Sequence, residues 1–204
     1  MEKYIQGEKV MAIFKPEGST LSGNFQGIVE VGIINFTNRA GEFDWADIFI
    51  DIELSVKNSE YSNKLSILGE LERDTSGKIN GGSVLKRMYR IFDALGCTAG
   101  MNIDGKFEDE HGNVIDSISE YLNERFLTKS EDYVVYIYKK KPKPGKKVYN
   151  EVYPRLYPNT DEGKAQCKKD INWLKSKGHL KEATEADMPQ MNDLNLADSA
   201  LNNL

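Results

Sequence analysis

Residues 133–157 read YVVYIYKKKPKPGKKVYNEVYPRLY, and the interpretation of the whole chain starts from this stretch. Two runs rich in tyrosine and valine, which favour a pleated and half-buried surface, flank a connector that contains Pro142, Pro144 and Gly145. Strand-forming runs on both sides of a turn-forming segment predict a β-hairpin with a long loop. We expect its strands at about 132–139 and 147–156.

The connector of this hairpin, residues 139–147, concentrates positive charge and is called the lysine loop below. Its lysines are Lys139, Lys140, Lys141, Lys143, Lys146 and Lys147. Six of the ten tyrosines of the chain lie within residues 133–157. Ammonium groups beside flat rings suit a ligand that is both polyanionic and aromatic, which is the chemistry of single-stranded nucleic acid. The alternative is a solvated hairpin tip whose tyrosines face the core.

The composition favours one domain with appendages. The 204 residues contain no apolar run near the roughly 18–20 residues of a membrane span, and the N-terminus lacks the apolar core of a signal peptide. Cys97 and Cys167 are too far apart to indicate a disulfide framework or a zinc site. We expect a soluble protein of the cytoplasm (the host cytoplasm if phage-encoded), with no membrane contact, cofactor or metal.

The net charge of −5 is unevenly distributed along the chain. All of the charged side chains after Lys181 are acidic, namely Glu182, Glu185, Asp187, Asp193 and Asp198. Because residues 182–204 are also poor in aromatic residues, we expect a disordered acidic tail. Such a tail can compete with nucleic acid for a basic groove or dock onto partner proteins, and a tail without any role is the alternative.

The order of the remaining elements predicts the fold class. Residues 46–56 alternate between apolar and polar side chains, which is the clearest strand signal in the chain, and residues 83–95 carry apolar residues at helical spacing between Ser83 as N-cap and Gly96. Gly23, Gly27 and Gly32 indicate a bulge or bend in the first strand. The other expected elements are strands at 20–36 and 64–71, a short helix at 117–126, and a helix from Asn159-Thr160 to about 177.

Five strands with a helix between strands three and four match the OB architecture, so we expect a mainly β protein with a five-stranded OB-fold-like barrel and an additional C-terminal helix. The OB fold holds oligonucleotides on strands two and three, on the loop between strands one and two, and on the loop between strands four and five, which is the lysine loop here. The expected organisation is an extension (1–19), the OB-fold domain (20–158) with an insertion at about 97–131, a basic helix (159–181) and the acidic tail (182–204).

The expected ligand contacts come from the lysine loop, the second hairpin strand and the loop between the first two strands. The lysines named above would neutralise phosphates. Tyr149, Tyr153, Phe43 and Trp45 are the stacking candidates, and Arg39 and Arg155 complete the predicted nucleic-acid-binding set.

The layout of a basic OB-type body followed by an acidic tail resembles small phage-encoded single-stranded-DNA-binding proteins of replication and recombination. Ile91-Phe92-Asp93-Ala94-Leu95-Gly96 and Gly145-Lys146-Lys147-Val148-Tyr149-Asn150 are similar to short motifs of those proteins, and the resemblance covers roughly residues 20–157. It implies largely sequence-independent binding of single-stranded DNA, with replication or recombination proteins as partners of the tail. The tail departs from the resemblance because it lacks a terminal aromatic or Pro-Phe. A second departure is that Asp47, Asp51 and Glu53 would repel phosphate on the outer face of strand two.

Two other functions are left open. Asp51 and Glu53 are similar to the first motif of the DEDD exonucleases, whose paired carboxylates hold Mg²⁺, and His111 with Asp116 matches the spacing of a late motif. A middle Asp motif is not evident, and the interval between first and last motifs is short for that family. A protein-interaction module with a basic hairpin is the other alternative, and whether the chain is a homodimer stays open.

Overall fold

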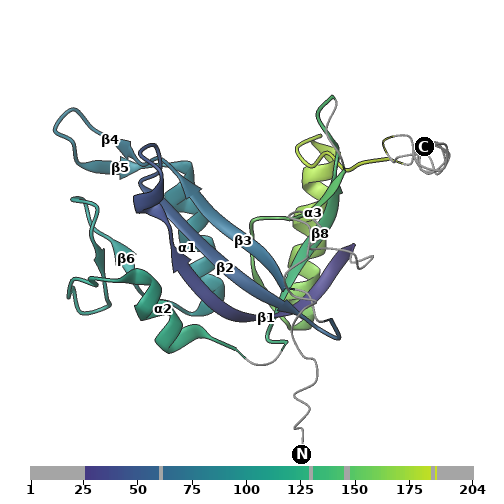
Figure 1. Ribbon diagram of the computed structural model, residues 1–204, viewed down its shortest axis with the longest axis horizontal. Coiled ribbons are helices and arrows are strands. Elements are labelled where there is room, and N and C mark those ends of the chain that lie inside the picture. The colour runs from purple at the N-terminus through teal and green to yellow at the C-terminus, as the bar shows by residue number, and fades with distance from the viewer. Residues whose placement is uncertain (1–25, 60–61, 129–130, 145–147, 185–186, 188–204) are drawn as a thin grey trace, which may run out of the picture.

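The computed structural model of the chain describes residues 26–59, 62–128, 131–144, 148–184 and 187. Its centre is a six-stranded antiparallel sheet, and three helices lie on it (Figure 1). The strands of this sheet are β1 (Gly27–Asn38), β2 (Ile48–Val56), β3 (Ser62–Gly69), β8 (Tyr133–Lys140), β9 (Tyr149–Val152) and β10 (Tyr157–Pro158). The helices are α1 (Ser83–Leu95), α2 (Ile118–Phe126) and α3 (Asp161–Ser176).

Strand β1 joins the two halves of the sheet. Residues 27–31 pair with β8, whereas residues 31–38 pair with β2, which in turn pairs with β3. Strands β9 and β10 both pair with the other edge of β8. The fold is therefore a mixed α/β structure dominated by an antiparallel sheet, as expected, but within the described residues no ladder joins β3 to β9 and the sheet is not a closed barrel.

The irregularity in β1 is a bulge between Ile33 and Asn35, and it leaves Ile34 exposed. The sequence prediction assigned the bend to glycines, but Gly32 keeps a regular partner in Ser55, and Gly23 lies outside the described residues. A bulge adds one unpaired residue and increases the local twist. The bulge lies where β1 leaves β8 and continues along β2.

The main core lies between β1, β2 and β3 on one side and α1 and α2 on the other. The predicted alternation in residues 46–56 is confirmed, because every second residue of β2 from Ile48 to Val56 is buried in this core. Helix α1 contributes Val84, Met88 and Ile91 at helical spacing. Its N-cap is Gly82 rather than the predicted Ser83, and Gly96 ends it in the left-handed conformation at φ 70°.

Helix α3 covers the opposite face of β8 and forms a second core. Val134, Tyr138 and Tyr157 are buried there against Cys167 and Ile171 of α3. Both faces of β8 are thus covered, since Val135 and Ile137 point into the main core. This arrangement explains why the strand is almost continuously apolar and aromatic.

The segments expected to be loops contain short hairpins. Strands β4 (Glu72–Arg73) and β5 (Ile79–Gly81) form one, and β6 (Gly100–Met101) and β7 (Phe107–Glu108) form another inside the predicted insertion. The insertion also contains α2, as predicted, with Ser117 as its N-cap. Among the described residues, no helix has the length and apolar character needed to cross a membrane.

After α3 the chain returns to the end of β8. The amide of Lys141 donates to the carbonyl of Lys181 (3.0 Å) and the amide of Ala183 donates to the carbonyl of Lys139 (2.8 Å). The predicted acidic tail therefore begins with residues that pair with a strand. Its residues 185–186 and 188–204, and the predicted extension 1–19, lie outside the described residues.

Candidate nucleic-acid interface

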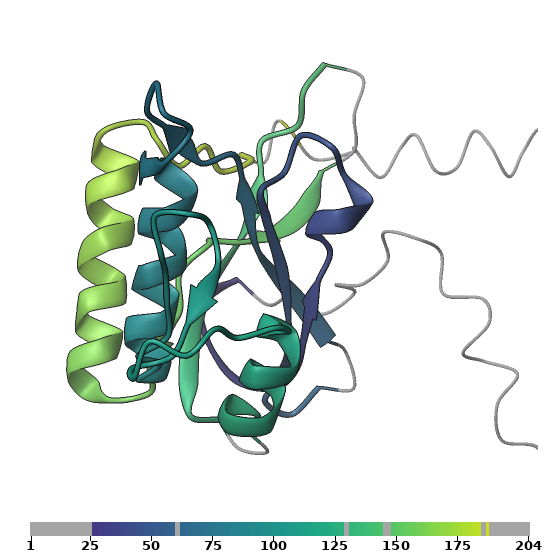
Figure 2. The ribbon, with the colours of Figure 1, turned by 90° about the vertical axis from the view of Figure 1, so that its left-hand side faces the viewer.

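The outer face of β2 and β3 points away from both cores. Phe49, Asp51 and Glu53 of β2 lie opposite Leu68, Ser66 and Lys64 of β3, and we call these six residues the sheet face. Figure 2 shows this side of the sheet turned away from α1 and α3. Phe49 and Asp51 are themselves buried, and Lys64 is the exposed side chain of this face, so Lys64 can contact a ligand without disturbing either core.

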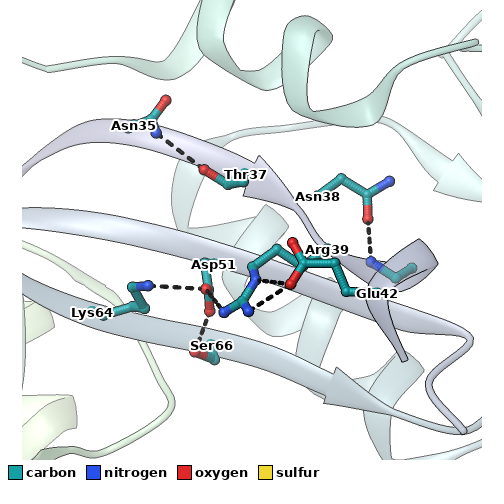
Figure 3. Close-up of polar contacts among 9 residues, drawn as sticks. Asn35, Thr37, Asn38, Arg39, Glu42, Asp51, Lys64 and Ser66 are labelled. Carbon is teal, nitrogen blue, oxygen red and sulfur yellow. Dashed lines mark hydrogen bonds and ion pairs between the residues drawn. The ribbon is translucent and has the colours of Figure 1, made fainter. Parts of the chain in front are cut away.

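Asp51 is the centre of the polar network on the sheet face (Figure 3). Its carboxylate accepts hydrogen bonds from Ser66 Oγ (2.5 Å) and Arg39 Nη1 (3.2 Å), and Lys64 Nζ lies 3.1 Å from Oδ2. Burial raises the pKa of this carboxyl, but the hydrogen bonds from Ser66, Lys64 and Arg39 outweigh burial and hold the pKa below its usual value. Two cations therefore offset the carboxylate that was expected to repel phosphate.

The loop between β1 and β2, residues 39–47, carries the predicted Arg39, Phe43 and Trp45. The guanidinium of Arg39 donates to Glu42 (2.6 Å) as well as to Asp51, and it lies over the rings of Phe43 (5.5 Å) and Phe49 (5.0 Å). Arg39 is thus held by two carboxylates, which weakens its predicted role as a phosphate ligand. Trp45 is 49% exposed and has its ring centroid 6.1 Å from that of Phe43, so this pair can stack with a base.

The lysine loop is only partly free to contact a ligand. Lys140 is paired with Glu151 (2.6 Å) and Lys141 with Asp187 (3.6 Å), whereas Lys143 is exposed and has no recorded partner in the described part of the chain. Lys139 is half-buried and engaged in a contact. Lys146 and Lys147 lie outside the described residues.

The remaining candidates lie on and just after β9, and they differ in their exposure to solvent. Tyr149 is 51% exposed at the start of β9 and is available for stacking. Tyr153 is half-buried against the second core, where burial raises its pKa, and Arg155 forms an ion pair with Asp170 while lying over the ring of Tyr157. The prediction that Tyr153 and Arg155 face the ligand conflicts with this placement, because both residues serve the packing of α3.

A cleft of about 540 Å³ lies between β3 and β9, at the seam where the sheet fails to close. Its cations are Lys64 and Arg87, and its carboxylates are Glu53 and Glu151. Arg87 of α1 has no recorded hydrogen-bond or ion-pair partner among the described residues. The buried amide nitrogen of Asn63 in the cleft wall is likewise unpaired there.

The elements that carry exposed aromatic residues flank the sheet face. In Figure 1 the loop 39–47 and the end of β8 stand on opposite sides of β2 and β3. In Figure 2 both lie on the side of the molecule that is turned away from α1 and α3. A strand of nucleic acid that crossed the sheet face would therefore pass from Trp45 over Lys64 to the cleft and Tyr149.

The structure does not bring the nuclease candidates into one site. His111 and Asp116 are exposed residues that follow β7, and Asp51 is committed to Ser66, Arg39 and Lys64. Among the described residues, no group of three or more histidine, cysteine or acidic side chains is placed to hold a metal ion.

Lys64 and Arg87 were not among the predicted contacts. Lys64 belongs to a predicted strand, but its exposure depends on the register between β2 and β3. Arg87 lies in the predicted helix 83–95, and only the folded structure brings it to the cleft. Comparison with models of protein families, with curated proteins and with solved structures finds no match to the chain.

Proposed function

We propose that this protein binds single-stranded DNA, largely without sequence preference, and acts in DNA replication or recombination. The observation that carries the proposal is a pair of exposed aromatic residues, Trp45 and Tyr149, that flank the sheet face, with the exposed Lys64 and the cleft residue Arg87 between them. Aromatic side chains stack on any base, and cations that track the backbone bind any phosphate. This combination therefore favours a single strand of any sequence.

The strand order supports an OB-like arrangement as part of the proposal. Strands β1, β2, β3, β8 and β9 follow one another in the order of the five OB strands, and α1 lies between the third and the fourth. The loop 39–47 and the lysine loop then correspond to the two loops that flank an OB binding face. In this interpretation the cleft between β3 and β9 is the seam of an incompletely closed barrel.

The acidic segment after α3 supports a regulatory part of the proposal. Glu182 forms an ion pair with Lys175 (2.9 Å), and Asp187 lies 3.6 Å from Lys141 of the lysine loop. An acidic chain that starts beside these lysines can compete with phosphate for them or recruit replication and recombination proteins.

Fluorescence anisotropy with a labelled oligo-dT over a salt series tests the proposal. We expect binding that weakens with salt by about 0.7 logarithmic units per contacted phosphate for each decade of salt. Replacing Trp45 or Tyr149 by alanine should each weaken binding by about 1–3 kcal/mol, the contribution of one stacked base. Ile103→Ala, which removes an exposed apolar side chain from the turn between β6 and β7, is the matched control.

The same titration discriminates between the alternatives. Absence of binding at low salt would refute the proposal and favour a protein-interaction module. Shortening of the oligonucleotide after Mg²⁺ is added would instead indicate the nuclease.

A further inference from the structure

Helix α3 presents a second basic and aromatic surface on the other side of the molecule. Lys168, Lys169 and Trp173 of α3, Lys177 at its C-cap and His179 after it are exposed, and these residues are called the helix face. Trp173 is 56% exposed, and its ring centroid lies 5.8 Å from that of His179. Lys169 and Lys177 lie four residues before and after Trp173, so all three side chains share one face.

The positive charge of the helix face is not neutralised within the described structure. Lys168, Lys169 and Lys177 have no recorded carboxylate partner there. The nearby acidic residue Asp170 is instead paired with Arg155 and accepts a hydrogen bond from Tyr157 (2.9 Å). The exposed acidic residues of α3, Asp161 and Glu162, lie in its first turn, roughly 16–18 Å along the helix axis from Trp173 at 1.5 Å per residue.

The segment that follows the helix face pairs with the start of the lysine loop. The C-terminal end of α3 leads to Lys181, whose carbonyl accepts a hydrogen bond from the amide of Lys141, and Ala183 pairs with Lys139. Figure 1 shows this end of α3 beside the end of β8. Residues 139–141, at the start of the lysine loop, therefore lie between β9 and the segment that follows α3.

We propose that the helix face is a second contact surface for single-stranded DNA, which passes from the sheet face over residues 139–143 and onto α3. This inference rests on the proposed function, because the sheet face supplies the primary site. Trp173 would stack with a base, and Lys169 and Lys177 would bind the phosphates on either side of it. The consequence is a dependence on DNA length, because an oligonucleotide that fills the sheet face alone cannot reach Trp173.

The two tryptophans of the chain make this inference directly measurable, because Trp45 lies in the loop that flanks the sheet face and Trp173 lies on the helix face. In the Trp173→Phe variant the remaining emission reports on the sheet face, and in the Trp45→Phe variant it reports on the helix face. Both would be titrated at constant pH with oligo-dT of about 8 and about 30 nucleotides, a range that brackets the site sizes of single OB folds. DNA is kept in excess so that each oligonucleotide carries one protein.

We expect the short oligonucleotide to quench Trp45 alone and the long one to quench both tryptophans. Replacing Trp173 by alanine should weaken binding of the long oligonucleotide by about 5-fold to 150-fold, the effect of one stacked base, and leave the short one unaffected. The double variant Lys169→Gln/Lys177→Gln should lower the salt slope for the long oligonucleotide by about 1.4, at about 0.7 per phosphate contact. Lys78→Gln/Lys106→Gln removes the same charge from the tips of the two small hairpins. It should change neither the affinity nor the salt slope for the long oligonucleotide.

The outcomes separate this inference from the proposed function. If both oligonucleotides bind and quench Trp45 while Trp173 emission and the lysine variants show no effect, the inference is overturned and the proposed function stands. If the short oligonucleotide quenches Trp173 as strongly as the long one, α3 is a primary site and the proposed path is wrong. If neither binds, the proposed function fails and the inference with it.

Discussion

Replacement of Asp51 by asparagine tests the sheet face most directly. Asparagine keeps one acceptor oxygen for Arg39 or Lys64, and its amide can donate to Ser66 Oγ. The loss is then about one charge-assisted hydrogen bond, which contributes about 1.5–3 kcal/mol. Because the side chain of Lys64 is 56% exposed and regains water, we expect the lower end, a decrease of about 1.5 kcal/mol in the free energy of unfolding. For a chain of this size that corresponds to a melting temperature lower by about 3–6 °C.

The same substitution should strengthen DNA binding at low salt. Arg39 remains held by Glu42, so the cation that Asp51→Asn releases is Lys64. One additional phosphate contact would steepen the dependence of log K on log salt by about 0.7. Denaturant unfolding and a salt series of anisotropy titrations would measure the two effects on one sample.

Asp104→Asn is the matched control, since it removes the same charge from an exposed turn between β6 and β7. It should change stability by less than about 0.5 kcal/mol and leave the salt slope unchanged. If Asp51→Asn loses stability but keeps the parent's salt slope, DNA does not cross Lys64 and the reasoning about the sheet face is wrong. Loss of a Mg²⁺-dependent cleavage activity in this variant would point to the nuclease instead.

Three further predictions concern the packing of α3. Tyr153→Ala should lower the melting temperature without changing affinity for a short oligo-dT, and a weaker affinity at unchanged stability would return Tyr153 to the binding site. Hydrogen bonds from Lys164 and Lys57 lower the pKa of Glu30 from 4.5 to about 2, so the stability that they contribute is complete above about pH 4.5 and is lost as the pH falls towards 2. When acid unfolding is followed by circular dichroism, the Glu30→Gln variant should therefore lose less stability over this pH range than the parent protein. An unchanged profile would contradict the role given to Glu30. Gly163→Ala should lower the free energy of unfolding, measured with denaturant, by about 1–3 kcal/mol or more, because the added methyl carbon would lie 2.1 Å from a backbone oxygen of β10. The control Ala165→Gly, at an exposed position of α3, should lower it by only about 1 kcal/mol.

Local patterns explain which elements could be predicted from the sequence. The strand from Ile48 to Val56 and helix α1 carry their periodicity in consecutive residues, and Thr160 caps α3 as its sequence indicates. The two small hairpins were missed because each has strands of only two or three residues. Such strands are too short to show an alternation of apolar and polar side chains.

The candidate site was harder to predict because it depends on contacts between distant residues. The sequence suggests that Arg155 is a free cation, but α3 brings Asp170 against it. The sequence also suggests that Tyr153 is exposed, but the same helix covers it. Asp51 likewise reads as a repulsive charge until Arg39 and Lys64 are placed beside it by the turn and the strand register. Residue types alone indicate the chemistry of the site. The packing of α3 and the pairing of β2 with β3 determine which of these residues can contact a ligand.

The paired lysines determine how much of the predicted charge can act on DNA. A phosphate that binds Lys141 must displace Asp187, and one that binds Lys140 must displace Glu151, so each exchanges one anion for another. Such an exchange releases fewer counterions than binding to a lysine without a carboxylate neighbour, and its contribution to the salt slope should fall below about 0.7. Lys143→Gln should therefore lower the slope by more than Lys141→Gln. Equal effects of the two variants would mean that Asp187 does not hold Lys141 in solution.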